Sequence, residues 1–374
     1  MQTIQMVDLQ RQYHKIKPEI DAAIAEIMTS AQFINGPSVK QFAQNLAQYL
    51  EVKHVIPCGN GTDALQIALM ALDLQPGDEV ITCPFTFVAT AEVIALLRLK
   101  PVFVDANPCT FTINEYQIEQ AITPRTKCIL PVHLFGQAAN MEAIMKIAAK
   151  HNLFVIEDNA QAIGADFYFS DGRKQKVGTI GTIGCTSFFP SKNLGAYGDA
   201  GAIFTNDDEL ANKINVICNH GSSVRYYHDE IGVNSRMDTL QAAILDIKLK
   251  HLDEYCSARQ QVAKFYSEHL GKKSGITVPK VARYSSHVFH QYTMLVENGR
   301  DELKKALESA GIPAMIYYPV PLHLQKAYAG DGYKAGDFPV SEELASKVLS
   351  LPMHTELDEK TLTFIAETLK KSLS

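Results

Sequence analysis

The stretch that decides the fold is KHVIPCGNGTDALQIALMALDL, Lys53 to Leu74. Its first six residues form a short apolar run typical of a strand buried on both faces, and the glycine-rich turn GNGT leads directly into a segment with helical spacing. Similar apolar runs recur as DEVITC, KPVFVD, KCILPVH and LFVIED, with helical segments between them. This alternation predicts an α/β fold, with a mostly parallel sheet flanked by helices on both faces.

The order of predicted strands and helices changes near residue 250. A helical stretch is expected from Met237 through Leu270, after a segment without clear period, Gly221 to Arg236, that is expected to be a long loop. Beyond it, HQYTMLVE and MIYY read as strands and RDELKKALESAG reads as a helix. The chain is therefore expected to divide into a large domain with an N-terminal arm, residues 1–250, and a smaller α+β domain, residues 251–374.

The composition is that of an ordinary soluble enzyme. The chain has 374 residues, of which 46% are hydrophobic and 20% charged, and its net charge of -6 argues against nucleic acid as a partner. No apolar run reaches the roughly 18 residues of a membrane span, and the first residues lack the apolar centre of a signal peptide, so a cytoplasmic location is expected. The seven cysteines are widely spaced without a CxxC pair, which favours free buried thiols over a metal site.

Small residues follow the first strand at the point where a parallel sheet binds ligands. In Gly59-Asn60-Gly61-Thr62-Asp63, backbone N–H groups at a helix N-terminus suit a phosphate. Plain turn chemistry is the alternative reading. The sequence has neither the Walker lysine pattern nor a GxGxxG after a strand, which leaves nucleoside triphosphate and dinucleotide sites without support.

Two other strand ends carry candidate ligand contacts. Asp158 follows the apolar run LFVIE and could cap a helix or hold a proton on a heterocyclic nitrogen. Phe85 lies just past another strand and could be a core residue or stack on a flat ring.

Lys192 lies between CTSFFPS and NLGAYGDAG, and apolar and glycine-rich flanks are unusual for a surface lysine. An ammonium group held in such surroundings loses hydration, its pKa falls, and the free amine becomes a nucleophile and base. Together, a phosphate turn, an acidic residue for a ring nitrogen, a stacking aromatic and a desolvated lysine are the four contacts that pyridoxal 5'-phosphate (PLP) requires.

Over nearly its whole length the sequence resembles the nucleotide-sugar aminotransferases of the DegT/DnrJ/EryC1/StrS family. The motifs that carry the resemblance are GNGTDAL, PGDEVIT, FTFVATA, PVFVD, HLFGQ, VIEDNAQ, SFFPSKNLGAYGDAGA, NHG, GVNSRMDTLQAAIL and YPVPLHLQ. The resemblance implies fold type I of the PLP enzymes, with a seven-stranded sheet in the large domain, and a homodimer whose active sites are shared across the interface.

Carried over position by position, the resemblance assigns roles at the cofactor. Lys192 would form the Schiff base with PLP, Asp158 would pair with the ring nitrogen, Phe85 would stack on the ring and Gln161 would lie near its phenolic oxygen. The phosphate contacts would be Gly61, Thr62, Ser187 and, from the neighbouring subunit, Asn234.

The substrate contacts are expected to be Arg236, Arg225, Tyr318 and His323, with a surface or interface contact as the alternative for each. The sequence departs from the family's usual His-Tyr before ProxPro, because Tyr317 stands in place of the histidine. That departure affects the fine substrate specificity.

The nearest enzymes by resemblance aminate carbon 3 of a UDP-linked 2-acetamido-3-keto-glucuronic acid with L-glutamate, for surface polysaccharides such as O-antigen. The alternatives are amination at carbon 4 of a UDP- or dTDP-linked 4-keto-6-deoxy sugar, and a catalytically silent member that acts as a regulator or scaffold.

Overall fold

The centre of the fold is a seven-stranded sheet in the computed structural model, which describes residues 3–373. Its strands, in spatial order, are β1 (His54–Cys58), β9 (Gly201–Thr205), β8 (Ile183–Ser187), β5 (Phe154–Asp158), β4 (Thr126–Ile129), β2 (Glu79–Thr82) and β3 (Lys100–Phe103). Of these seven, only β9 runs against the others, pairing antiparallel with β1 and β8. The mostly parallel sheet expected from the sequence is confirmed.

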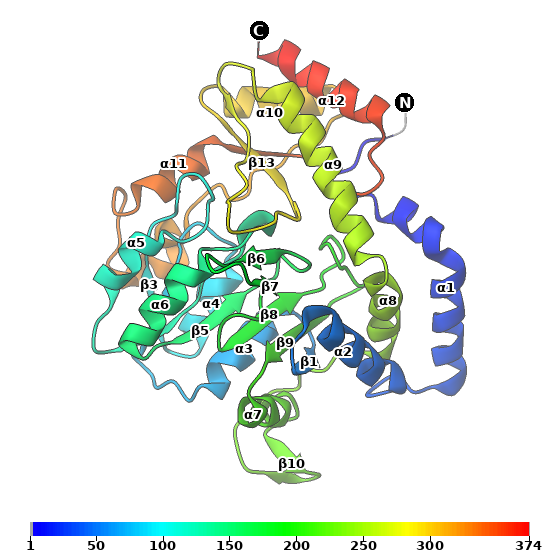
Figure 1. Ribbon diagram of the computed structural model, residues 1–374, viewed down its shortest axis with the longest axis vertical. Coiled ribbons are helices and arrows are strands. Elements are labelled where there is room, and N and C mark those ends of the chain that lie inside the picture. Colours follow the sequence, from blue (N-terminus) through cyan, green and yellow to red (C-terminus); the bar gives the residue numbers. More distant parts are fainter. Residues whose placement is uncertain (1–2, 374) are drawn as a thin grey trace.

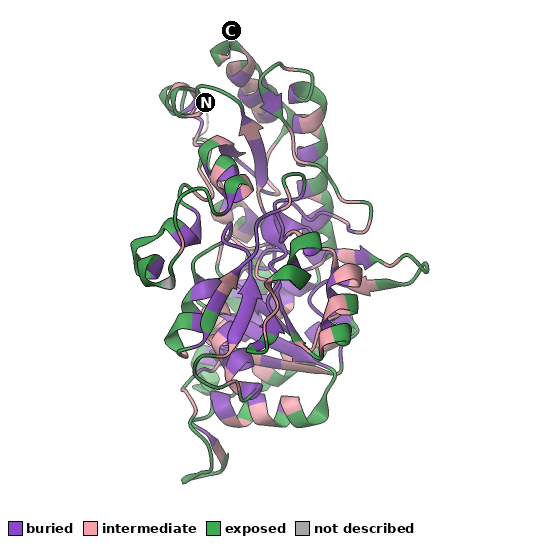
Figure 2. Ribbon diagram, turned by 90° about the vertical axis from the view of Figure 1, so that its left-hand side faces the viewer, coloured by how far each residue is buried: buried purple, intermediate pink, exposed green. Residues whose placement is uncertain are grey.

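Helices cover both faces of this sheet, and its strands are buried between them (Figures 1 and 2). One face packs against α3 (Gly61–Ala71), α4 (Ala89–Leu96) and α7 (Asp208–Cys218). The other face packs against α2 (Pro37–Leu50), α6 (Met141–His151), α8 (Thr239–Leu249) and the short α5 (Glu115–Ile118). Burial on both faces explains why these strands read as continuous apolar runs.

A smaller unit has its own apolar core beside the large sheet (Figure 1). It consists of an antiparallel sheet, β12 (Ile276–Thr277), β13 (Tyr292–Val296) and β14 (Val348–Leu351), with α9 (Leu252–Leu270), α10 (Arg300–Ser309) and α12 (Glu359–Ser372). The N-terminal segment joins this unit, because Ile4 packs on its core and the Met353 N–H donates to the Met6 carbonyl at 3.1 Å. The helix α1 (Leu9–Ser30) then packs on α8.

Three local expectations need correction. MIYY, Met315–Tyr318, is not a strand: Met315 forms one isolated bridge with Ser350, and β14 supplies the third strand of the small sheet. The expected loop between Gly221 and Arg236 contains the hairpin β10 (Ser222–Val224) and β11 (Tyr227–His228). The helical stretch to Leu270 is broken into α8 and α9 at Lys250 and His251.

The remaining elements are a hairpin, a helix and several 3-10 turns. They are the hairpin β6 (Asp166–Tyr168) and β7 (Lys174–Lys176), the helix α11 (Pro339–Lys347), and the 3-10 turns η1 (Glu119–Ala121), η2 (Leu134–Gly136), η3 (Leu322–Leu324) and η4 (Lys326–Asp331). Between residues 3 and 373, no helix has the length and apolar content needed to cross a membrane.

A buried glutamate anchors the turn that precedes β8. Glu157, in β5, accepts hydrogen bonds from the backbone N–H groups of Gly178, Ile180 and Gly181 at 2.6–2.9 Å. It also contacts Nε2 of the fully buried His133 at 2.8 Å, while Nδ1 of that ring accepts from the Ala139 N–H. Because Nδ1 is an acceptor, Nε2 carries the proton and donates it to Glu157. Through these hydrogen bonds, Glu157 and His133 hold the turn before β8 and the segment after β4 against the end of β5.

We expect Glu157→Gln to lower the free energy of unfolding by about 3 kcal/mol, because an amide cannot accept all of these bonds and one N–H group faces its NH₂. Urea denaturation measures the change. The control is Glu119→Gln, which removes an exposed partner of Lys150 and His151 and should cost less than about 1 kcal/mol. Equal losses in the two variants would contradict the anchoring role.

Candidate active site

Lys192 lies in the loop that follows β8, and its amine has no hydrogen-bonding or ionic partner within the part of the chain that the structure describes. Its backbone N–H donates to the Phe189 carbonyl at 2.8 Å, which closes a tight turn at this position. Burial lowers the pKa of the Lys192 amine to about 8, and the negative charge of Asp158 opposes that decrease. A substantial fraction of the amine is therefore neutral near physiological pH, as a nucleophile requires.

Asp158, the last residue of β5, is buried and held in one orientation. Its Oδ2 accepts from the Thr90 hydroxyl at 2.9 Å, and its Oδ1 accepts from the Ala160 N–H at 3.1 Å. Burial raises the pKa of the Asp158 carboxyl, while these two hydrogen bonds and the nearby Lys192 act in the other direction. A buried carboxylate of this kind gains stability from a cationic partner such as a protonated ring nitrogen, so Asp158 suits that role.

Thr90 is a residue that the sequence analysis missed. It lies in α4 within the motif FTFVATA, fully buried, and only the folded structure brings it opposite β5. The sequence did offer one signal: Thr90 carries a hydroxyl in the first turn of the helix that follows β2.

An aromatic wall bounds the same region. The Phe85 ring makes edge contacts with Phe111, Phe135 and Tyr318 at centroid distances of 6.3–6.4 Å. Gln161 joins two parts of this wall, since its Oε1 accepts from the Phe135 N–H at 2.8 Å and its Nε2 donates to the Tyr318 hydroxyl at 3.0 Å. Phe85, Gln161 and Tyr318 thus belong to one cluster, as the sequence analysis requires.

The glycine-rich turn before α3 is built by a close approach of two chain segments. Gly61 begins α3, and a Cβ atom at this position would lie 2.6 Å from the Cβ of Ser187 at the end of β8. Only glycine fits there. The contact places the hydroxyl-bearing Thr62 and Ser187 at the start of α3. The Asp63 N–H there donates to the capping side chain of Asn60 at 2.8 Å, and the N–H groups of Gly61 and Thr62 precede the first intrahelical bonds. The donor set suits a phosphate group.

Ser235 ties a distant loop to this turn, and it too was missed. Its hydroxyl oxygen accepts from the Gly59 N–H at 2.9 Å and donates to the Asp63 carboxylate at 2.6 Å. The neighbours of Ser235 are thereby brought next to the turn: Asn234 is exposed, and Arg236 donates to the Asn219 side chain at 3.3 Å.

Two candidate substrate residues lie apart from this cluster. Arg225 is exposed on the β10–β11 hairpin, which stands off the body of the molecule, and its guanidinium lies over the Tyr226 ring (Figure 1). His323 is buried, with Nε2 3.0 Å from the Glu342 carboxylate and its ring against Phe338.

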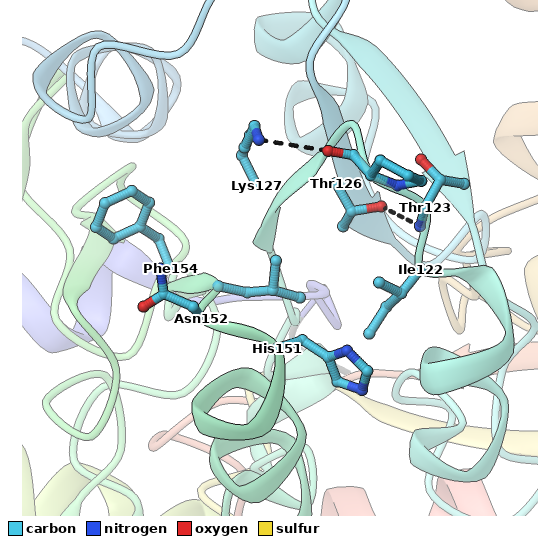
Figure 3. Close-up of a pocket in the computed structure, with 9 residues that line it drawn as sticks. Ile122, Thr123, Thr126, Lys127, His151, Asn152 and Phe154 are labelled. Carbon is cyan, nitrogen blue, oxygen red and sulfur yellow. Dashed lines mark hydrogen bonds between the residues drawn. The ribbon is translucent and has the colours of Figure 1, made fainter.

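A cavity of about 550 Å³ lies at the opposite ends of the strands, beside the first residues of β4 and β5 (Figure 3). Its polar groups are largely engaged within the protein: Thr126 accepts from the Thr123 N–H, Lys127 donates to the Pro124 carbonyl, and His151 pairs with Glu119. The reactive amine of Lys192 belongs to the other end of the sheet, so this cavity is not the active site.

Comparison with known proteins agrees with this geometry. The chain is 50% identical over 366 residues to a "Pleiotropic regulatory protein" of Geobacillus stearothermophilus, with 97% of each chain covered. It is 47% identical to the UDP-2-acetamido-2-deoxy-3-oxo-D-glucuronate aminotransferase of Pseudomonas aeruginosa, covering 98% of this chain and 99% of that one.

Among solved structures, DesV of S. venezuelae, in complex with a ketimine intermediate, superposes with a TM-score of 0.96 at 37% identity. The match covers 100% of this chain and 99% of DesV. The family model of the DegT/DnrJ/EryC1/StrS aminotransferases matches residues 14–370. The protein is a PLP-dependent aminotransferase, and its chain belongs to the DegT/DnrJ/EryC1/StrS family.

Proposed function

We propose that this enzyme transfers the amino group of L-glutamate to carbon 3 of UDP-2-acetamido-2-deoxy-3-keto-glucuronic acid. The observation that carries the chemistry is the partly buried amine of Lys192, which has a lowered pKa, is influenced by the charge of Asp158 and has no hydrogen-bonding partner among the described residues. The choice of sugar is supported by 47% identity, over nearly the whole chain, to an aminotransferase named for that substrate. The product would serve surface polysaccharide synthesis in the cytoplasm.

The residues divide the chemistry between them. When bound, PLP supplies an electron sink for the negative charge that develops at the reacting carbon. Asp158 holds a proton at the ring nitrogen, Gly61, Thr62 and Ser187 hold the phosphate, and Phe85 and Gln161 orient the ring. Lys192, as a neutral amine, removes the proton from the α-carbon of glutamate and returns one at carbon 3 of the sugar in the second half-reaction. Ping-pong kinetics follow.

Arg236 is the proposed partner of the uronate carboxylate, and Tyr318, which contacts Gln161 and Phe85, is proposed as a second substrate contact. The guanidinium of Arg236 makes a single hydrogen bond, to Asn219, and so keeps donors for a bidentate contact. His323 is proposed to support the substrate site indirectly, by holding the turn Leu322–Leu324 in place, because its ring is buried against Glu342.

We further propose a homodimer in which Asn234 of one copy reaches the phosphate of the other. Asn234 is exposed, and the neighbouring hairpin presents Val224, Tyr226 and Tyr227, each 60–79% exposed, as apolar surface for a second copy. Arg225 on the same hairpin would then serve the partner's substrate.

A catalytically silent member that acts as a regulator or scaffold is one alternative, and one relative is named a "Pleiotropic regulatory protein". Such a protein has no need for a partly buried amine without a partner, because withdrawing the amine from water costs free energy. Amination at carbon 4 of a deoxy sugar is the alternative within the enzyme class, and the substrate panel below separates it.

Lys192→Ala should abolish the yellow chromophore of the purified protein and its bleaching by borohydride, because no amine is left to bond the aldehyde. Absorbance spectra and peptide mass spectrometry after borohydride detect the link. Lys250→Ala, at an exposed lysine, is the control and should behave like the wild type. A borohydride-stable cofactor adduct elsewhere in the chain would overturn the assignment, and a protein that takes up no cofactor would support the silent alternative.

Arg236→Lys should raise KM for the 3-keto uronate roughly 10- to 100-fold, because a bidentate charged contact worth about 1.5–3 kcal/mol is lost. The same change should alter KM less than about 3-fold for the matched 3-keto sugar that lacks the carboxylate. Steady-state assays with both sugars and a 4-keto-6-deoxy sugar measure this, with Arg283→Lys at an exposed site as the control. Conversion of the 4-keto sugar alone would refute the substrate assignment.

A further inference from the structure

Lys248 is a buried lysine that the mechanism leaves without a role. It lies in α8 with 1% of its surface exposed, and within residues 3–373 no acidic side chain pairs with it. Its Nζ donates to the Gly195 carbonyl and lies 5.0 Å from the centroid of the Tyr197 ring. A lysine is almost never fully buried without an anionic partner, since its charge loses hydration there.

Both polar side chains on this face of α8 bind the loop that carries Lys192. Gln241 and Lys248 are seven residues apart, close to two helical turns, so they project from the same side of the helix. Gln241 accepts from the Tyr197 N–H at 2.9 Å and donates to the Tyr197 carbonyl at 3.3 Å. The helix therefore holds the loop by its backbone at two successive points, Gly195 and Tyr197.

The loop itself is closed and tightly packed. The Ala196 N–H donates to the Phe188 carbonyl at 2.7 Å, and a Cβ atom on Gly195 would lie 2.3 Å from the Pro190 carbonyl oxygen. On the opposite side, Asn193 donates to the Val288 carbonyl at 2.9 Å. Because these contacts close residues 188–196 into a compact loop, a displacement of Gly195 would also displace Lys192.

We propose that Lys248 is a positioning residue: by donating to the Gly195 carbonyl, it fixes the closed loop and keeps the amine of Lys192 partly withdrawn from water near Asp158. The proposal rests on the role assigned to Lys192 above.

Lys248 acts through the backbone rather than by its own charge. The pKa of Lys192 is lowered by burial and opposed by Asp158, and Lys248 is not among the charges that affect it. Burial, assisted by the positive charge of Arg259, lowers the pKa of Lys248 to about 7. Either protonation form of an amine can donate to Gly195, so the contact does not depend on the charge.

The test measures the amine of Lys192 directly, in the full chain freed of cofactor. Pulses of acetic anhydride from pH 6 to 11, followed by peptide mass spectrometry, give the pH midpoint for labelling of Lys192. In the wild type this midpoint should be near 8. In Lys248→Met it should move up by about one unit or more toward the ordinary lysine value, because the released loop readmits water. Lys250→Met, at the exposed neighbour, is the control and should leave it unchanged.

Lys248→Arg retains a hydrogen-bond donor, so its labelling midpoint should lie between those of the wild type and Lys248→Met. If lost packing alone raised the midpoint, the arginine would not restore it. An unchanged midpoint in a folded Lys248→Met protein overturns the proposal. If that variant does not fold, Gln241→Leu decides, because it releases the same loop at Tyr197: a raised midpoint supports the proposal and an unchanged one overturns it. These outcomes are independent of the borohydride experiment, which tests the role of Lys192 itself.

Discussion

The partly buried amine of Lys192 and the buried carboxylate of Asp158 influence one another's charge, yet they form no ion pair among the described contacts. Burial drives both groups toward their neutral forms, lowering the pKa of one and raising that of the other. A ligand with an aldehyde and a protonated ring nitrogen is complementary to both at once. The surrounding structure holds these two groups in place: Thr90 orients the carboxylate, and α8 holds the loop that carries the amine.

The central sheet was predictable because its strands are buried on both faces and alternate with helices, so that short apolar runs such as LFVIED identify them without knowledge of their neighbours. The small sheet was predictable only in part: HQYTMLVE contains β13 and RDELKKALESAG forms α10, as expected, but the strand that pairs with β13 as β14 was misplaced. MIYY has the composition of a strand, but Val348–Leu351 occupies that place beside β13, and a choice between two apolar segments depends on contacts distant in sequence.

The same distinction applies to the site. Lys192 and Asp158 were recognisable because apolar and glycine-rich residues flank the lysine and an apolar strand precedes the aspartate. Gln161 and Tyr318 followed from the family resemblance. Thr90, Ser235 and Lys248 have ordinary flanks, and each acquires its role from a chain segment that folding brings opposite to it. His323 illustrates the converse case: its motif suggested a substrate contact, whereas Glu342, nineteen residues later in the chain, occupies its ring nitrogen.

The contact between Gly61 and Ser187 has a consequence for how such enzymes diverge. Because even one methyl group at Gly61 would collide with the end of β8, the proposed phosphate side of the site admits no larger side chain there. New sugars must be accommodated elsewhere, and the aromatic side offers that freedom, since the half-exposed Phe87 leans on Tyr318 at its outer margin. In this chain the room for a changed substrate therefore lies on the aromatic flank, because the contact between Gly61 and Ser187 leaves no space for a larger side chain on the other.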